Sequence, residues 1–108
     1  MRRQDTARLE ARATVIKALA HPTRLFLVEE LARRERCVCE LAAMVGADVS
    51  TVSRHLALLK TAGLVKTEKR GAQVVCRLRA PCVLRFLDCV GEVMESAAAQ
   101  QWKAARAR

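Results

Sequence analysis

The sequence predicts a mainly helical domain with one small β-hairpin, and three observations lead to that fold class. Apolar residues make up 52% of the chain and recur mostly with the spacing of helices. Between residues 64 and 79 the period changes from 3.6 to 2, which indicates two strands. A chain of 108 residues is long enough for one core but not for two, so residues 1–108 are predicted to form a single domain.

A proline separates the first two predicted helices. An apolar stripe predicts a helix over residues 5–20. Pro22 ends that helix and fits the first turn of the second one, where its missing N–H costs nothing. His21, just before the proline, is predicted to be a cap or a surface residue rather than a ligand. The second helix runs out in the charged residues 33–36.

The next segment has the pattern of two short helices joined by a turn. A third helix is predicted over residues 37–45, and Gly46 is the usual residue for a left-handed helix exit. Asp48 or Ser50 is expected to cap the fourth helix. Its expected inward-facing residues are Val52, Leu56 and Leu59. Two helices around a glycine-containing turn form a helix-turn-helix motif, predicted here over about residues 37–62.

The period-2 segment is predicted to be a hairpin over about residues 64–79. Its strands are expected at residues 64–68 and 73–79, around the turn at Gly71. Cys76 is predicted to lie on the packed face as a core residue. Because an isolated two-stranded hairpin is only marginally stable, the hairpin must pack against the helices. The fold class is therefore a winged helix-turn-helix with the predicted element order α1-α2-α3-α4-β1-β2-α5.

The last predicted helix, over about residues 82–101, is apolar on more than one face. A helix of that kind needs burial on two sides. Only three residues of the chain are aromatic, and a small helical domain with so little aromatic mass often gains burial by oligomerising. We therefore expect a homodimer formed through the helices at about residues 5–20 and 82–101.

Composition limits the possible partners and the compartment. Twenty Lys and Arg against eleven Asp and Glu give a net charge of +9, which attracts polyanions. The sequence contains no run of about 18 apolar residues that could span a membrane. Residues 1–20 lack the apolar segment of a secretory signal, so a cytoplasmic location without membrane contact is expected. Five cysteines, an odd number, are then expected to be reduced thiols rather than disulfides.

The first half of the fourth helix and the hairpin turn carry the residues expected to contact DNA. In helix-turn-helix proteins this half of the second helix enters the major groove, where hydroxyls and arginine read base edges. The candidates on the helix are Ser50, Thr51, Ser53, Arg54 and His55. Lys69 and Arg70 at the hairpin turn are expected to contact phosphates. A two-fold symmetric dimer predicts double-stranded DNA with an inverted-repeat operator, whose half-sites lie about 34–36 Å apart.

Two cysteines one residue apart, Cys37 and Cys39, immediately precede this motif and are candidate metal ligands. Thiolates select soft ions. On a regular helix the two sulfurs would be about 200° apart, so a shared ion requires the first turn to open. Cys82 and Cys89 are seven residues apart, and either is a candidate third ligand. The alternative is that all four are small apolar residues of the core or of the dimer interface.

Several segments together resemble the ArsR/SmtB family, which comprises small dimeric winged-helix repressors that leave DNA when they bind metal. These segments are Leu19-Ala-His-Pro-Thr-Arg24, Cys37-Val-Cys-Glu-Leu41, Ser53-Arg-His-Leu-Ala-Leu-Leu-Lys60 and Gly63-Leu-Val65, followed by Arg70-Gly71. The cysteine segment is similar to the metal box of the arsenic-responsive branch. The resemblance implies As(III) or Sb(III) as inducer, with Cd, Pb or Zn as alternatives. Ala42 stands where the arsenic-responsive relatives carry a third cysteine.

Two other readings keep the DNA binding and change the chemistry. Cysteines can sense oxidants or persulfides by forming disulfide or polysulfide links. A constitutive DNA-binding protein with inert core cysteines is the other alternative. An enzyme is not expected, because the sequence contains no nucleophile–base pair or phosphate loop, and Cys-x-Cys differs from the Cys-x-x-Cys of redox enzymes.

Overall fold

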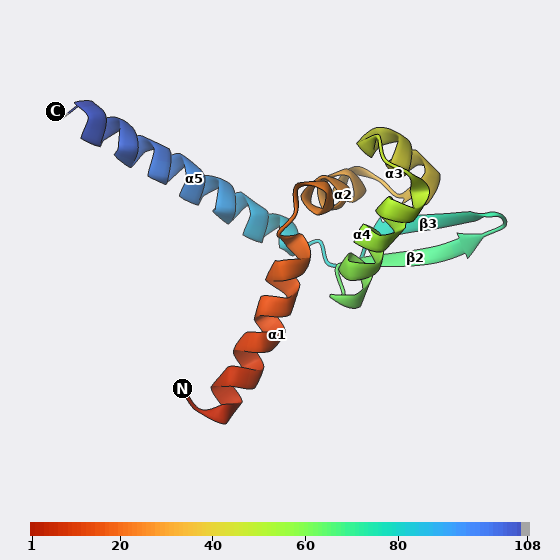
Figure 1. The fold of residues 1–108 in the computed structure, drawn as a ribbon, viewed down its shortest axis with the longest axis horizontal. Helices are drawn as coiled ribbons and strands as arrows, with labels where there is room; N and C mark the ends of the chain where they lie inside the picture. The colour runs from red at the N-terminus through yellow and green to blue at the C-terminus, as the bar shows by residue number, and fades with distance from the viewer. Residues whose placement is uncertain (107–108) are drawn as a thin grey trace.

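The computed structural model describes residues 1–106 and contains five helices and three strands in that range (Figure 1). The elements, in chain order, are α1 (Arg3–Leu19), α2 (Pro22–Arg33), β1 (Arg36–Cys37), α3 (Val38–Val45), α4 (Val49–Thr61), β2 (Val65–Arg70), β3 (Gln73–Leu78) and α5 (Val83–Arg106). The predicted fold class, a mainly helical winged helix-turn-helix, is confirmed. The hairpin of β2 and β3 extends to one side of the helices as the wing.

Polar caps and a glycine set the ends of the helices, largely as predicted. The His21 side chain accepts a hydrogen bond from the Thr23 backbone N–H at 3.0 Å and so caps α2. Asp48, rather than Ser50, caps α4: its carboxylate accepts from the Thr51 backbone N–H at 2.7 Å. Gly46 ends α3 with a φ of 78°, in the left-handed region that favours glycine.

The sheet has three strands in the order β1-β3-β2, whereas the sequence predicted only two. The additional strand, β1, pairs antiparallel with β3, with Arg36 opposite Cys76 and Cys37 opposite Val75. The prediction that Cys37 begins the third helix is therefore wrong by one residue. Its backbone is extended, and it precedes α3 as the N-cap. A two-residue strand is too short to leave a periodic pattern in the sequence, which is why it was missed.

The hydrophobic core lies between α2, α3, α4 and the inner face of the sheet. Leu27 of α2, Leu41 of α3 and Leu59 of α4 are fully buried, together with Val65 of β2. Cys76 of β3 is also fully buried, so its predicted place in the core is confirmed. This core fixes α4 against both α3 and the wing.

Helices α1 and α5 extend away from this core (Figure 1). Ile16 of α1 is 50% exposed and Val93 of α5 is 68% exposed, although both lie on apolar stripes. Helix α5 continues to Arg106, beyond the predicted end near residue 101. A single chain thus leaves the apolar faces of both helices uncovered. Within residues 1–106 no helix is both long enough and apolar enough to cross a membrane.

Candidate nucleic-acid interface and thiol site

The first half of α4 presents most of the predicted DNA-contacting side chains at the surface. Ser50, Ser53 and Arg54 are exposed, and Thr51 is half-buried. Hydrogen bonds from the Thr51 side chain and backbone lower the pKa of the Asp48 carboxyl, which keeps the helix cap ionised. Arg54 lies over the Thr51 hydroxyl, with Nη2 and Oγ1 3.4 Å apart. These hydroxyls and the guanidinium form one polar, solvent-accessible end of the helix.

His55 lies deeper than the other predicted contacts and is held by groups outside α4. The Arg24 Nη1 lies 3.2 Å from His55 Nδ1, and the His21 and His55 ring centroids are 4.5 Å apart. Arg24 also donates from Nε to the Ala18 carbonyl at 2.6 Å, which links the end of α1 to α4. Because arginine has no acceptor, His55 Nδ1 must accept and Nε2 must carry the ring proton.

This environment favours the neutral form of His55. Burial lowers the pKa of the ring, and the nearby charges of His21, Arg24 and Arg54 lower it further. His55 was predicted as a site residue, but its partner Arg24 was not. The contact joins residues 31 positions apart and leaves no local signal beyond the segment that contains His21 and Arg24.

The two predicted phosphate contacts of the wing differ in their surroundings. Lys69 is exposed. Arg70 already has two carboxylate partners: Nη1 donates to Glu35 Oε1 at 2.8 Å, and Nη2 donates to Glu68 Oε2 at 3.0 Å. The side chains of Glu35 and Arg70 are each 46% exposed. Glu35 was not among the predicted site residues, because the contact spans 35 positions.

The two cysteines of the Cys37-Val-Cys39 segment differ strongly in exposure. Cys37 is 6% exposed, whereas Cys39, in the first turn of α3, is exposed. The Cys37 backbone N–H donates to Glu40 Oε1 at 3.0 Å, as part of a capping box at the start of α3. One thiol is therefore packed at the junction of β1 and α3, and the other is open to solvent.

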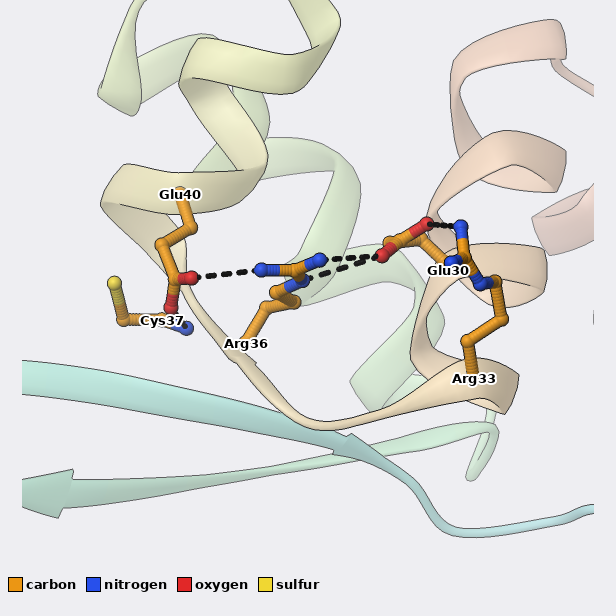
Figure 2. Close-up of polar contacts among 5 residues, drawn as sticks. All are labelled: Glu30, Arg33, Arg36, Cys37 and Glu40. Carbon is orange, nitrogen blue, oxygen red and sulfur yellow. Dashed lines mark hydrogen bonds and ion pairs between the residues drawn. The ribbon is translucent and has the colours of Figure 1, made fainter.

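An ion-pair chain of Glu30, Arg36 and Glu40 holds this junction (Figure 2). Arg36 Nε and Nη2 donate to Glu30 Oε1 at 3.2 and 3.0 Å, and Arg36 Nη1 donates to Glu40 Oε2 at 2.9 Å. Glu30, on α2, is only 4% exposed and also pairs with Arg33 at 3.4 Å. The hydrogen bond from the Cys37 N–H, and next the bond from Arg36, lower the pKa of Glu40 to about 2. Glu40 therefore stays charged and ties Cys37 to α2.

The other candidate thiols lie near α5. Cys82 is exposed just before α5 begins, so the prediction that it starts the helix is wrong by one residue. It lines a cavity of about 510 Å³ together with Ile16 and Phe86. Cys89 is exposed on α5. Within residues 1–106 of one chain, no three Cys, His, Asp or Glu residues are grouped closely enough to hold a metal ion.

Comparison with known proteins gives consistent matches. Residues 21–67 match the family model described as bacterial regulatory protein, arsR family. The chain is 40% identical over 90 residues to the HTH-type transcriptional repressor SmtB of Mycobacterium tuberculosis, covering 82% of this chain and 67% of that protein. It is 32% identical to a homodimeric winged helix-turn-helix DNA-binding domain from Mycobacterium bovis, a possible ArsR-family regulator. That match covers 91% of both chains with a TM-score of 0.77.

A further solved structure, reduced HlyU from Vibrio cholerae N16961, is 26% identical with a TM-score of 0.71. It covers 85% of this chain and 97% of that one. The family model, the M. tuberculosis repressor and the M. bovis domain confirm the resemblance predicted from the sequence. They also confirm that the chain is a regulator and not an enzyme. The predicted partners, double-stranded DNA and a second copy of the chain, agree with the homodimeric DNA-binding domain from M. bovis.

Proposed function

Because the chain belongs to the ArsR/SmtB family of bacterial transcriptional repressors, we propose that it binds an inverted-repeat operator and releases it on binding As(III) or Sb(III) through Cys37 and Cys39. The observation that carries this proposal is the double position of Cys37. It is at once the N-cap of α3 and a residue of β1 in the wing sheet. A change at this one residue reaches both DNA-contacting elements.

The DNA-binding part of the proposal rests on exposure and charge. Ser50, Ser53 and Arg54 are proposed to read base edges, because they are exposed at the first half of α4. Between residues 49 and 79, seven Lys or Arg face one acid, Glu68, which gives a local charge of +6. The cations of the wing are proposed to contact phosphates, which position the protein without specifying sequence.

The homodimer is proposed to form through α1 and α5. Their apolar side chains, including Ile16, Phe86 and Val93, are exposed in the single chain. The cavity of about 510 Å³ lies between these helices and is lined mainly by apolar residues, so a second copy could fill it. A dimer doubles the net charge of +9 and presents two copies of α4, as an inverted repeat requires.

The thiol pair fits a soft ion by its chemistry, with one condition. Sulfur donors select soft ions, and Cys39 is exposed to receive one. Cys37 is packed at the N-cap of α3, so we propose that it leaves this place to bind the ion together with Cys39. A bound ion would form bonds to the thiolates of Cys37 and Cys39. The free energy of such bonds is large enough to drive a local rearrangement at the start of α3.

That rearrangement is the proposed link to operator release. When Cys37 turns outward, Glu40 loses the backbone N–H that it accepts at 3.0 Å, and the first turn of α3 opens. Helix α3 packs directly against α4, so the reading residues move with it. Operator release requires a difference of only a few kcal/mol, roughly, in ion affinity between the two arrangements.

A third ligand is proposed to come from Cys82 or Cys89 of the partner subunit, or from an external thiol or water. Ala42, at the position of the third cysteine in arsenic-responsive relatives, is buried and offers no donor. Both Cys82 and Cys89 are exposed close to the proposed dimer interface. Single serine substitutions would separate these alternatives, since only the true ligand changes the ion affinity.

The test is fluorescence anisotropy of the reduced protein on a labelled fragment of the DNA upstream of its own gene. Arsenite, antimonite, Cd, Pb, Zn and a polysulfide are titrated in parallel. The proposal expects tight binding in buffer and release by arsenite and antimonite at the lowest concentrations. Release by Cd or Pb alone would keep the site and change the ion. Binding that no reagent relieves would make the protein a constitutive DNA binder.

A second candidate function is an oxidant or persulfide switch on the same fold. The observation that favours it is the exposure of three thiols, Cys39, Cys82 and Cys89. The solved relative HlyU was obtained in a form named as reduced. Release of the operator by polysulfide or peroxide, reversed by a thiol reductant and absent with arsenite, would favour this function.

A further inference from the structure

The wing arginine Arg70 is held by a carboxylate from outside the wing. Its partner Glu68 is two residues away on the same strand, but Glu35 comes from the connection between α2 and β1. The Arg70 Nη1 to Glu35 Oε1 distance is 2.8 Å, shorter than either contact with Glu68. The single cation of Arg70 is thus matched by two acids. A DNA phosphate would find this guanidinium already occupied.

A groove of about 260 Å³ surrounds this contact on the face of the sheet that carries Lys66, Arg70 and Arg77. Lys66 and Arg77 are directly opposite each other in the β2–β3 ladder, and Glu35 precedes β1, which pairs with β3. Three cations, Lys66, Arg70 and Arg77, therefore line the groove that holds the Glu35 carboxylate.

We propose that this groove is a DNA phosphate site, formed by Arg70 and Arg77 and occupied by the Glu35 carboxylate until DNA displaces it. A guanidinium N–H donates to a phosphate oxygen as readily as to a carboxylate oxygen, so Arg70 Nη1, which donates to Glu35 here, can donate to a phosphate instead. The inference rests on the proposed DNA binding of the wing, and it adds that the Glu35 carboxylate competes with DNA phosphate for Arg70. Glu35 is then a positioning residue that sets how readily Arg70 engages DNA.

The exposure of the contact makes this exchange feasible. Both side chains are 46% exposed, and exposed ion pairs contribute little to stability. Breaking such an exposed ion pair changes the equilibrium constant of binding by up to about fivefold. The contact between Glu35 and Arg70 can therefore be broken when a phosphate binds Arg70. A dimer places two wings on an inverted-repeat operator, so the effects of the two wings on the operator affinity multiply to at most about 25-fold. Glu35 also lies two residues before Cys37, so the segment that carries the thiols carries the competitor as well.

The test compares the operator affinity of the full-length dimer with that of Glu35→Gln. Glu29→Gln is the matched control, because Glu29 is an exposed glutamate of α2 with no ion pair among residues 1–106. Both substitutions remove one negative charge per chain, so a general charge effect moves both equally. The same change is then made in an Arg70→Gln background. Thermal unfolding checks that all variants are folded.

The proposal expects Glu35→Gln to bind operator about 2- to 25-fold more tightly than wild type, beyond any change in Glu29→Gln. Its salt dependence should also be steeper, since about one more phosphate contact forms per wing. Both gains should vanish in the Arg70→Gln background. Equal affinities for Glu35→Gln and Glu29→Gln, or a gain that persists without Arg70, would overturn the site and leave the repressor proposal intact. A wild-type protein that binds no upstream fragment would overturn both.

Discussion

Replacing Glu30 by glutamine is predicted to destabilise the fold although it preserves the size of the side chain. Glu30 is 4% exposed and accepts from Arg36 at 3.0 and 3.2 Å and from Arg33 at 3.4 Å. A glutamine turns one of these oxygens into an NH₂ group that faces arginine donors. It also leaves Arg36 without its buried counter-charge.

The magnitude follows from how buried each partner is. Breaking a fully buried ion pair costs about 3–5 kcal/mol, and leaving a buried polar group unpaired costs about 1–3 kcal/mol. The Arg36 side chain is 20% exposed and Arg33 is 75% exposed, so water compensates part of the loss. The lower range applies, and the free energy of unfolding should fall by about 1–3 kcal/mol. A loss of 2 kcal/mol lowers Tm by about 8–16 °C in a domain of this size.

The assay is denaturant and thermal unfolding followed by far-ultraviolet circular dichroism at a fixed protein concentration. Glu29→Gln, at the neighbouring exposed position, is the control and should change stability by less than about 0.5 kcal/mol. If Glu30→Gln were as stable as Glu29→Gln, Glu30 would not anchor Arg36. The ion pairs that connect α2 to Cys37 would then not stabilise the fold.

Three further predictions concern the core, a buried thiol and the half-buried His55. Leu59→Ala should lower the free energy of unfolding by about 2–5 kcal/mol, because Leu59 is fully buried between α4 and its neighbours. Denaturant titration measures this loss, and a loss below about 1 kcal/mol would contradict the prediction. Burial, and next the neighbouring Cys37, raise the pKa of Cys76 to about 11, so in the native protein Cys39 should be alkylated near neutral pH while Cys76 reacts only after unfolding. Peptide mass spectrometry distinguishes the two, and similar rates in the native state would refute the assignment. Burial lowers the pKa of His55 below its usual 6.5, so the unfolded chain binds the proton more readily and stability falls as the pH drops below about 6.5. His55→Gln should flatten this dependence, and an unchanged pH profile would exclude His55 as its source.

The fold was largely predictable because its helices carry periodic apolar residues and clear end signals. Pro22, Gly46 and Asp48 end or begin helices in the structure as local chemistry requires. The core positions Val52, Leu56 and Leu59 followed from the same period and are buried. Local rules were sufficient for these elements because each signal lies within a few residues of the feature it sets.

The contacts that define the site were not predictable in the same way. Strand β1 exists because residues 36 and 37 meet β3 about 40 positions later, and nothing in those two residues encodes the pairing. Arg24 with His55, and Glu35 with Arg70, are also long-range contacts. The sequence therefore indicated which residues could bind DNA or a metal ion. The tertiary structure decided which of these side chains are exposed and which are held by other residues. Cys37 and Cys39 illustrate this, since identical thiols two positions apart differ from buried to exposed.

The most direct test of the central claim compares arsenite-induced operator release in wild type, Cys37→Ser and Cys39→Ser. Serine is a preferred N-cap residue, so Cys37→Ser keeps the start of α3 and removes only the thiol. Cys76→Ser would disturb the core, and Cys82 and Cys89 are candidate third ligands, so the matched control is Ala43→Ser, which adds a hydroxyl at an exposed position of α3 and leaves every thiol in place. The account predicts that all three variants bind operator in buffer. It also predicts that Cys37→Ser and Cys39→Ser lose release at arsenite concentrations that free wild-type protein. Release by arsenite that is unaltered when both Cys37 and Cys39 are replaced would contradict it.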